Sequence, residues 1–384
     1  MKDILKTVLK LMIIIPLLGV IVIYSVDLFE KYFEEKEPIV LVVPQKPGSG
    51  TSVWAQIVAE QLGPYLEGRD VVIKHIPGAR DIPGFNEFHN TLRYDDNHVM
   101  VSHGGNGVSF LQEAVDYDYR DYESVGLMNL NIIVGKLKGT DGNNPSFAAG
   151  SGMVPEAYAI TLLLCGPNMT LEEYGQCFVD HVTWVNGMSG SERRLAFKRG
   201  ELNATRENPA AYKKHVESNE EAEIWFHHGI LDWVSGKHLD DPNYPGFQLE
   251  ELYFQRWGMY PDDPMMMPEA KQFYAAYKLV KSWRDGVQKA LWVNKGNPNL
   301  EMLREALQKM ANDPEAMAAI EAKVGKYEWV IGEAGNQQRD ALFRLIENPT
   351  LNTLVFFNNY VLGLTSVFKP DLVLDNLIEN QEQI

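Results

Sequence analysis

The sequence is short of basic residues and nearly free of cysteine. Lys and Arg number 35 against 52 Asp and Glu, and the formal net charge over the 384 residues is −17. A nucleic-acid-binding protein must meet phosphates with Lys and Arg, so this balance argues against nucleic acid as a partner. It does not exclude a local positive pocket, and the length is sufficient for two domains with a sizeable core.

Motifs of nucleotide-binding and hydrolytic proteins are also missing. No Lys follows Gly50 in the glycine-rich loop 44–52, as a P-loop requires, and the spaced glycines of a dinucleotide site match poorly. The Gly-x-Ser-x-Gly turn is absent. His227 and His228 are adjacent and therefore point apart, which is poor geometry for a metal site. We expect no cofactor, no metal and no enzymatic activity, and an exported hydrolase is an alternative.

The N-terminus predicts export. Lys2, Lys6 and Lys10 precede an apolar run over 11–26, the order of charge and apolarity found in export signals. The run is short for a membrane span, its small-residue cleavage motif is poor, and no lipobox cysteine is present. We expect 1–26 to be an uncleaved anchor that places the rest in the periplasm, tethered to the inner membrane. The alternative is a cleaved signal peptide and release into the periplasm, and 27–38 is expected to be a charged spacer.

The two cysteines, Cys165 and Cys177, are close in the sequence. In an exported protein such a pair could form a disulfide that closes a short loop. Two buried free thiols are the alternative, and the sequence leaves both open.

The stretch 39–56 organises the chain. An unbroken aliphatic run over 39–43 predicts a strand buried on both faces, as in a parallel sheet. A Pro/Gly/Ser/Thr cluster follows, and a helical pattern begins near Thr51 or Ser52, either of which could be the N-cap. Backbone N–H groups of such a loop and the helix dipole favour an anion. A carboxylate ligand fits best because it needs neither lysine nor magnesium.

The strand–loop–helix pattern recurs along the chain. Strands are expected at 71–75 and 98–102, each followed by a small-residue loop, and the pattern restarts after the polar break at 139–145. Alternating strands and helices indicate a doubly wound α/β sheet, which binds ligands at the carboxyl ends of its strands. The loops at 44–52, 77–84 and 102–107, which include Ser102, are expected at that edge.

Several segments, in order, resemble the substrate-binding proteins of tripartite tricarboxylate transporters, the Bug or TctC-type receptor family. The opening loop at 42–51 is similar to that of the family, as are the strand and Pro-Gly-Ala at 71–79 and Ala-Gly-Ser-Gly at 149–152. His181 to Gly187 stands where the family has His-Val-Pro-Tyr-Lys-Gly-Gly. Weaker similarity at 200–203, 241–247 and 303–318 extends the match over about 39–345.

The resemblance implies an α/β periplasmic-binding-protein fold, with two domains that each contain a mostly parallel sheet flanked by helices and a ligand cleft between them. By analogy, domain I comprises 39–138 and 286–384, and domain II comprises 139–285. The implied function is an extracytoplasmic solute receptor that closes by a hinge on a small carboxylate and serves membrane transporter subunits.

The resemblance and the strand-end loops together nominate ligand-binding residues in both domains. They are Gly48, Ser49, Gly50, Thr51, Ser52, Ser102, Gly150, Ser151, Gly152, Asn186, Gly187 and Met188. Arg80 stands where the family has a glycine and could pair with a carboxylate or lie in solvent. Ser52 replaces the usual Asp, which disfavours amino-acid ligands.

Two regions fall outside the resemblance. The aromatic and acidic insertion at 213–285 predicts either additional helical core or a docking face for a membrane partner. The tail at 346–384 contains an apolar segment interrupted by asparagines, which favours a packed helix. Because of Ser52 and the insertion, a membrane-anchored docking module without a ligand remains the alternative function.

Overall fold

The computed structural model describes residues 36–78, 81–140, 144–148, 154–326, 328–363 and 369. Within this part of the chain no helix is both long and apolar enough to cross a bilayer. The predicted N-terminal anchor at 1–26 lies outside the described residues, as do the first residues of the spacer and most of the tail beyond 363.

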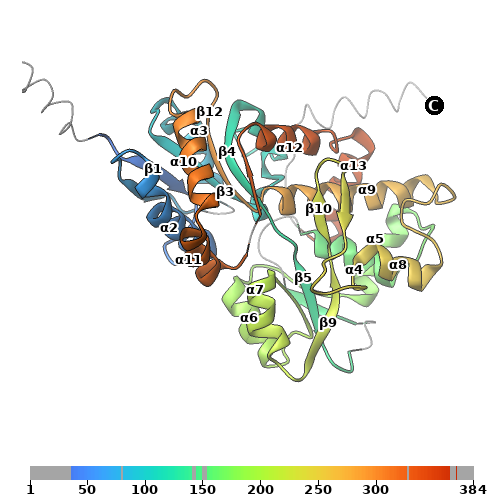
Figure 1. Cartoon of the computed structure of the whole chain (residues 1–384). Coiled ribbons are helices and arrows are strands. Elements are labelled where there is room, and N and C mark those ends of the chain that lie inside the picture. The colour runs from blue at the N-terminus through green and yellow to red at the C-terminus, as the bar shows by residue number, and fades with distance from the viewer. Residues whose placement is uncertain are drawn as a thin grey trace, which may run out of the picture.

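The described chain forms two mixed sheets, each flanked by helices, so the expected two-domain α/β class is confirmed (Figure 1). The six-stranded sheet has the order β13-β4-β12-β3-β1-β2, and the five-stranded sheet has the order β7-β6-β8-β5-β9. The strands of the first sheet are β1 (Ile39–Val43), β2 (Val71–His75), β3 (His98–His103), β4 (Tyr122–Asn129), β12 (Lys289–Asn294) and β13 (Glu328–Ile331). Those of the second are β5 (Ile133–Leu137), β6 (Ser146–Ala148), β7 (Thr183–Val185), β8 (Ala204–Glu207) and β9 (Ala222–His227).

Both sheets are mixed rather than purely parallel, and the chain path explains the reversed direction of β12 and β5. β1 pairs in parallel with β2 and β3, and β6 pairs in parallel with β7 and β8, as the strand–helix alternation predicted. β12 and β5 are the strands by which the chain enters each sheet from the other, and both run antiparallel to their neighbours. Each of these two strands begins at the edge of its sheet that faces the other sheet, which is the edge where the parallel strands end. It therefore runs opposite to them.

Helices cover both faces of the first sheet. Leu41 and Val43 pack with α2 (Gly50–Leu62) and α10 (Leu300–Asn312), whereas Val42 packs on the opposite face. β1 is therefore buried on both faces, which explains its unbroken aliphatic run. The other helices are α3 (Ile82–Asn90), α4 (Pro155–Leu164), α5 (Leu171–His181), α6 (Gly190–Lys198), α7 (Pro209–Tyr212), α8 (Leu249–Trp257), α9 (Pro268–Gly286), α11 (Pro314–Val324), α12 (Glu333–Phe343) and α13 (Asn348–Phe356).

The long helix α9 lies at the centre of a large hydrophobic core that also includes residues of α4, α12 and α13. Phe273, Tyr277 and Trp283 on it are fully buried, and it packs against α4, α12 and α13 (Figure 1). Much of the aromatic content of 213–285 therefore lies in core. A hairpin of β10 (Ile230–Asp232) and β11 (Lys237–Leu239) precedes α8 and packs beside α9.

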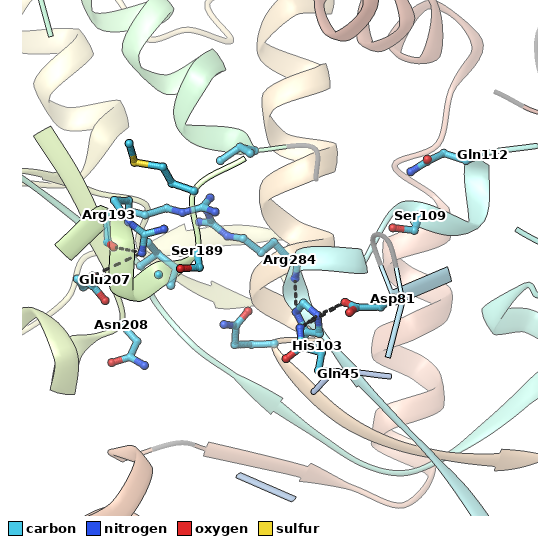
Figure 2. A pocket seen from close by; sticks show the side chains of 18 residues that line it. Gln45, Asp81, His103, Ser109, Gln112, Ser189, Arg193, Glu207, Asn208 and Arg284 are labelled. Carbon is cyan, nitrogen blue, oxygen red and sulfur yellow. Dashed lines mark hydrogen bonds and ion pairs between the residues drawn. The ribbon is translucent and has the colours of Figure 1, made fainter. Parts of the chain in front are cut away.

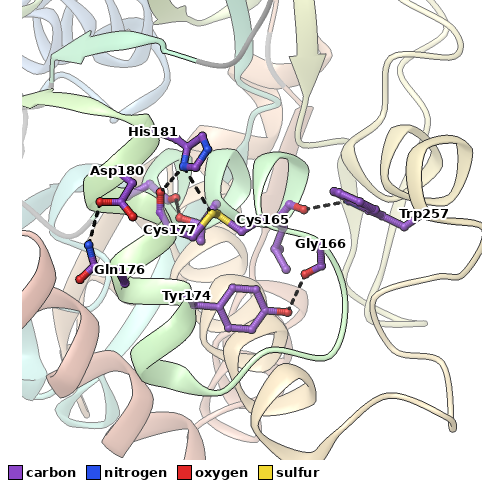
Figure 3. The surroundings of a disulfide bond; sticks show 11 residues. Cys165, Gly166, Tyr174, Gln176, Cys177, Asp180, His181 and Trp257 are labelled. Atoms are coloured by element: carbon purple, nitrogen blue, oxygen red, sulfur yellow. Dashed lines mark hydrogen bonds between the residues drawn. A yellow bond between two sulfur atoms is a disulfide. The ribbon is translucent and has the colours of Figure 1, made fainter.

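The two cysteines form a disulfide, which decides between the two alternatives that the sequence left open. It joins Cys165 at the end of α4 to Cys177 on α5, and the two Cα atoms lie 5.9 Å apart (Figure 3). The Tyr174 hydroxyl donates to the Gly166 carbonyl at 3.2 Å within the same loop. The disulfide and this hydrogen bond together fix the α4–α5 connection.

Candidate functional site

A cavity of about 490 Å³ lies where the loops of the two sheets meet (Figure 2). Residues after the carboxyl ends of β1, β2, β3, β7 and β8 line it, together with residues just before β5 and β12. Its lining residues are Gln45, Gly78, Asp81, His103, Gly105, Ser109, Gln112, Ile132, Val154, Met188, Ser189, Gly190, Arg193, Arg206, Glu207, Asn208, Arg284 and Gln288. This is the edge at which α/β sheets bind ligands.

The wall contributed by the first sheet is built around Asp81 and His103. Oδ2 of Asp81 lies 2.6 Å from Nε2 of His103, and the Gln45 side-chain amide lies 2.7 Å from the same nitrogen. Nδ1 of His103 accepts the Gly105 N–H at 3.0 Å. Both imidazole nitrogens are thus engaged, and neither bonds a serine hydroxyl among the described residues. His103 is therefore not arranged as the general base of a Ser-His-Asp triad.

The wall contributed by the second sheet is rich in arginine. Glu207, at the end of β8, receives two hydrogen bonds from Arg194, at 2.9 and 2.7 Å. Arg193 also contacts Glu207, at 3.5 Å, and donates to the Arg206 carbonyl at 2.9 Å. Burial lowers the pKa of Arg193 to about 10, so the side chain remains a cation at neutral pH. Glu207 thereby holds two guanidinium groups of α6 beside the cavity.

The base of the cavity is a buried network around Glu156 of α4. This carboxylate accepts from Arg206 at 2.6 Å and from Arg284 of α9, and it lies 3.3 Å from Nε2 of His228. Burial alone would raise the pKa of Glu156, but the charges of Arg206 and Arg284 outweigh it and hold the pKa well below its usual range. Burial also lowers the pKa of His228 to about 3, so His228 is neutral.

Arg284 retains an unused donor. Its side chain lines the cavity and is almost fully buried, and its Nε donates to Asp285 at 2.9 Å. Its Nη2 is buried without a hydrogen-bond partner among the described residues. A buried donor left unpaired costs about 1–3 kcal/mol, so a ligand oxygen here would recover free energy.

The arginine side of the cavity carries a net positive charge. Four guanidinium groups meet three carboxylates there, which gives a balance of +1 in a chain whose formal charge is −17. The cations are Arg193, Arg194, Arg206 and Arg284, and the anions are Glu156, Glu207 and Asp285. The N-terminus of α6, where Ser189 and Gly190 line the cavity, adds backbone N–H groups. This side is suited to an anion.

The predicted loop 48–52 lies beside the cavity lining rather than in it. Ser49, not Thr51 or Ser52, is the N-cap of α2, and its Oγ accepts from the Ser52 N–H at 3.2 Å. Thr51 and Ser52 are buried and bonded to Lys289 and His75, at 3.0 and 2.9 Å. Gly48 and Gly50 do not line the cavity either, although Gln45 of the same loop does.

Of the remaining predicted site residues, one lines the cavity, some lie elsewhere in the fold, and some fall outside the described residues. Met188 lines the cavity, whereas Asn186 accepts from Trp184 and donates to the Leu362 carbonyl, and Gly187 forms the turn with φ of +89°. Ser102 is buried and accepts the Trp292 indole N–H at 2.8 Å. Arg80, Gly150, Ser151 and Gly152 lie outside the described residues. Their roles in ligand binding stay predictions.

The cavity also contains residues that were not predicted. Asp81 and His103 belong to loops that the sequence placed at the carboxyl ends of the strands. Their location could therefore be predicted, but their pairing could not. Arg193 lies in the helix that follows the 186–191 loop. No sequence signal pointed to Arg284, because its position depends on how α9 packs against α4, α12 and α13.

Comparison with solved structures places the fold among periplasmic binding proteins. BugD superposes with a TM-score of 0.54 at 15% identity, covering 84% of this chain and 97% of that one. The fold is that of the Bug-type periplasmic binding proteins. MatC of Rhodopseudomonas palustris with bound malate gives a TM-score of 0.51 at 14% identity, covering 83% and 98% of the two chains. The resemblance indicated by the sequence motifs is thus confirmed at the level of the Bug-type fold.

Another R. palustris protein with this fold, solved with adipate, gives a TM-score of 0.51 at 13% identity, covering 83% of this chain and 97% of that chain. No protein-family model matches the sequence, and no curated protein matches it. The identities to these Bug-type structures are low enough that the similarity concerns the fold, and the ligand must be argued from this chain's own residues.

Proposed function

We propose that this protein is an extracytoplasmic solute receptor that binds a small carboxylate in the cavity between its two sheets. The observation that carries the proposal is the arginine side of that cavity, where Arg284 has a buried, unpaired Nη2. The Bug-type fold supports it, since two structures with this fold are described with malate and adipate.

The chemistry of the site suits a carboxylate. A guanidinium group is planar and always charged at neutral pH, and it matches the geometry of a carboxylate. Arg193 and Arg284 are held rigidly by Glu207, Glu156 and Asp285, so little side-chain entropy remains to be lost when a ligand binds. The α6 N-terminus adds donors at the edge of the cavity.

Closure about a hinge is the proposed mechanism. Asp81 and His103 reach the cavity from the first sheet, and Ser189 and Glu207 from the second, so a ligand between them completes its contacts only when the walls approach. Because β5 begins at Ile133 and pairs within the second sheet, we propose a first crossing at 130–132, ahead of the predicted residue 139. The predicted return lies near 286, between α9 and β12.

The finer parts of the proposal concern location and partners. A receptor of this kind acts in the periplasm, and its closed form would be recognised by the membrane subunits of a tripartite tricarboxylate-type transporter. The basic and apolar N-terminus at 1–26 would either tether it to the inner membrane or be cleaved during export. In this role the protein binds and releases its ligand unchanged and is not an enzyme.

A thermal-shift screen of the full chain, in mild detergent, tests the proposal. The panel contains mono-, di- and tricarboxylates, aromatic acids and amino acids. A ligand that binds only the folded state adds about 2.7 kcal/mol of stability at a hundredfold excess over its Kd. A selective rise in Tm with one class of acid is expected. An unchanged Tm with every acid, from protein that melts cooperatively, would overturn the receptor and favour the ligand-free docking module.

A further inference from the structure

The two walls of the cavity differ in charge. The arginine side carries a net positive charge, whereas the only carboxylate on the opposite wall, among the described lining residues, is that of Asp81. In Figure 2, Arg193 and Glu207 lie on one side of Arg284, and Asp81 and His103 lie on the other. A ligand that spans the cavity therefore meets unlike surroundings at its two ends.

Hydrogen bonding indicates that His103 does not neutralise Asp81. Nδ1 of His103 accepts the backbone N–H of Gly105 at 3.0 Å and therefore carries a lone pair rather than a proton. The single imidazole proton is then on Nε2, which donates to Oδ2 of Asp81 at 2.6 Å, and the Gln45 amide, 2.7 Å from the same nitrogen, faces this N–H with its oxygen. The ring is neutral in this arrangement, and the pair keeps the negative charge of the carboxylate.

In the part of the chain that the structure describes, the other charged groups near this wall do not line the cavity. The buried ammonium of Lys289 donates to the Thr51 hydroxyl at 3.0 Å and is not among the residues that line the cavity. Gln45 and Asn106 approach Oδ2 of Asp81 at 3.3 and 3.4 Å, but both are neutral amides. Among the described residues, Asp81 is thus the charged group that lines this end of the cavity.

We propose that the ligand is a monocarboxylate whose far end carries a hydrogen-bond donor, an ammonium or hydroxyl group, rather than a second carboxylate. The inference rests on the proposed function and specifies its substrate class. The carboxylate meets Arg193 and Arg284, and the donor group meets Asp81. A diacid would place a second anion beside Asp81, where like charges repel because the Asp81 side chain is only 14% exposed.

Two matched series of acids test this inference on the full chain by isothermal titration calorimetry. One series is hexanoate, its ω-hydroxy and ω-amino derivatives, and adipate. The other is butyrate, its ω-hydroxy and ω-amino derivatives, and succinate. Each series changes only the far end of the ligand. In the series that fits the cavity, we expect an ω-amino or ω-hydroxy acid to bind at least about tenfold more tightly than the diacid, a difference of about 1.4 kcal/mol.

Asp81→Asn provides the matched variant. Asp81 has a φ of +64°, a conformation that Asn also tolerates, so the variant should fold. Removing the charge should reduce the ratio of the diacid Kd to the ω-amino acid Kd by at least about tenfold. The control is Asp180→Asn. Asp180 is an exposed residue of α5 that accepts a hydrogen bond from Gln176, and its replacement should leave the preference unchanged.

The outcomes separate this inference from the receptor function. If a diacid binds more tightly than its donor-bearing partners, or if Asp81→Asn leaves the preference unchanged, the inference is overturned and the receptor stands. If no acid in either series binds and the carboxylate screen is also negative, the receptor function itself fails, and the inference fails with it.

Discussion

At the scale of single residues, the Glu156 carboxylate is held by partners from two elements. It is fully buried and bonded to two guanidinium groups, from Arg206 of β8 and Arg284 of α9. Glu156→Gln would leave these buried cations without their shared anion. Breaking a buried ion pair on one side typically costs about 3–5 kcal/mol, so we expect urea unfolding to show a loss of that order.

The control for this loss is an exposed carboxylate on a helix. Glu305 on α10 is exposed, and Glu305→Gln should change the free energy of unfolding by no more than about 0.5 kcal/mol. Equal stability of the Glu156 and Glu305 variants would show that the network does not hold α4, β8 and α9 together as the structure indicates.

Lys289 gives a prediction about pH. Burial lowers its pKa from 10.5 to about 8, although the charge of Asp81 opposes this. Above pH 8 the folded state therefore loses a proton that the unfolded state keeps, and stability rises with pH. In Lys289→Met this part of the rise should be absent, a difference of about 2 kcal/mol between about pH 7.5 and 9.5.

Chemical unfolding at several pH values measures this difference. Lys281 is also buried with a pKa lowered to about 8, and it contributes equally to both proteins, so only the difference between them is informative. Lys309→Met, at an exposed position of α10, serves as the control. Parallel pH profiles for the wild type and Lys289→Met would contradict the assignment.

At the scale of elements, the N-termini of two helices can be compared directly. Ser189 caps α6 at the cavity, and Thr170 caps α5, and each forms a capping box with a Glu three residues later. Ser189→Ala and Thr170→Ala should each cost about 1 kcal/mol of stability. Only Ser189→Ala should also weaken carboxylate binding, by about 1 kcal/mol, because only that hydroxyl lines the cavity.

Melting curves and calorimetric titrations of the two variants give both quantities. An equal loss of affinity in both variants would mean that binding follows overall stability. Unchanged affinity in Ser189→Ala would remove the α6 N-terminus from the site.

The sequence predicted most elements because hydrophobic periodicity is a local signal. The strands at 71–75 and 98–102 are confirmed as β2 and β3, and the late helix near 303–318 is present but divided at Asp313, which caps α11. The N-cap of α2 was misplaced because Ser49, Thr51 and Ser52 are all suitable cap residues, and only the backbone geometry shows that Ser49 has the extended conformation of a cap.

At the scale of the whole molecule, the sequence predicted that loops of two α/β domains would form the site. Most of the residues predicted in those loops differ from the ones that line the cavity. The family resemblance directed attention to position 52, where relatives usually have an acid, but Ser52 is buried and bonded to His75. The acid that lines the cavity is Asp81. Arg284 and Glu156 are 128 residues apart, and their contact depends on how α9 packs against α4. Such pairings follow from the tertiary arrangement and have no local signature.

Two glycines allow a direct test of whether the cavity between the sheets is the binding site. Gly50 and Gly190 are each the first residue of a helix and each follow a capping serine, and a Cβ at either would meet no atom closer than 4.0 Å. Leucine should therefore be tolerated at both positions. Only Gly190 lines the cavity, whereas Gly50 belongs to the loop that the sequence favoured.

The decisive measurement is the Kd of the best carboxylate from the screen for Gly190→Leu and Gly50→Leu, determined by titration calorimetry alongside the wild type. If the cavity between the sheets is the binding site, Gly190→Leu should weaken binding at least about tenfold, and Gly50→Leu should bind like the wild type. Wild-type affinity in Gly190→Leu together with a loss of affinity in Gly50→Leu would rule out the cavity as the binding site and place the ligand on the loop after β1.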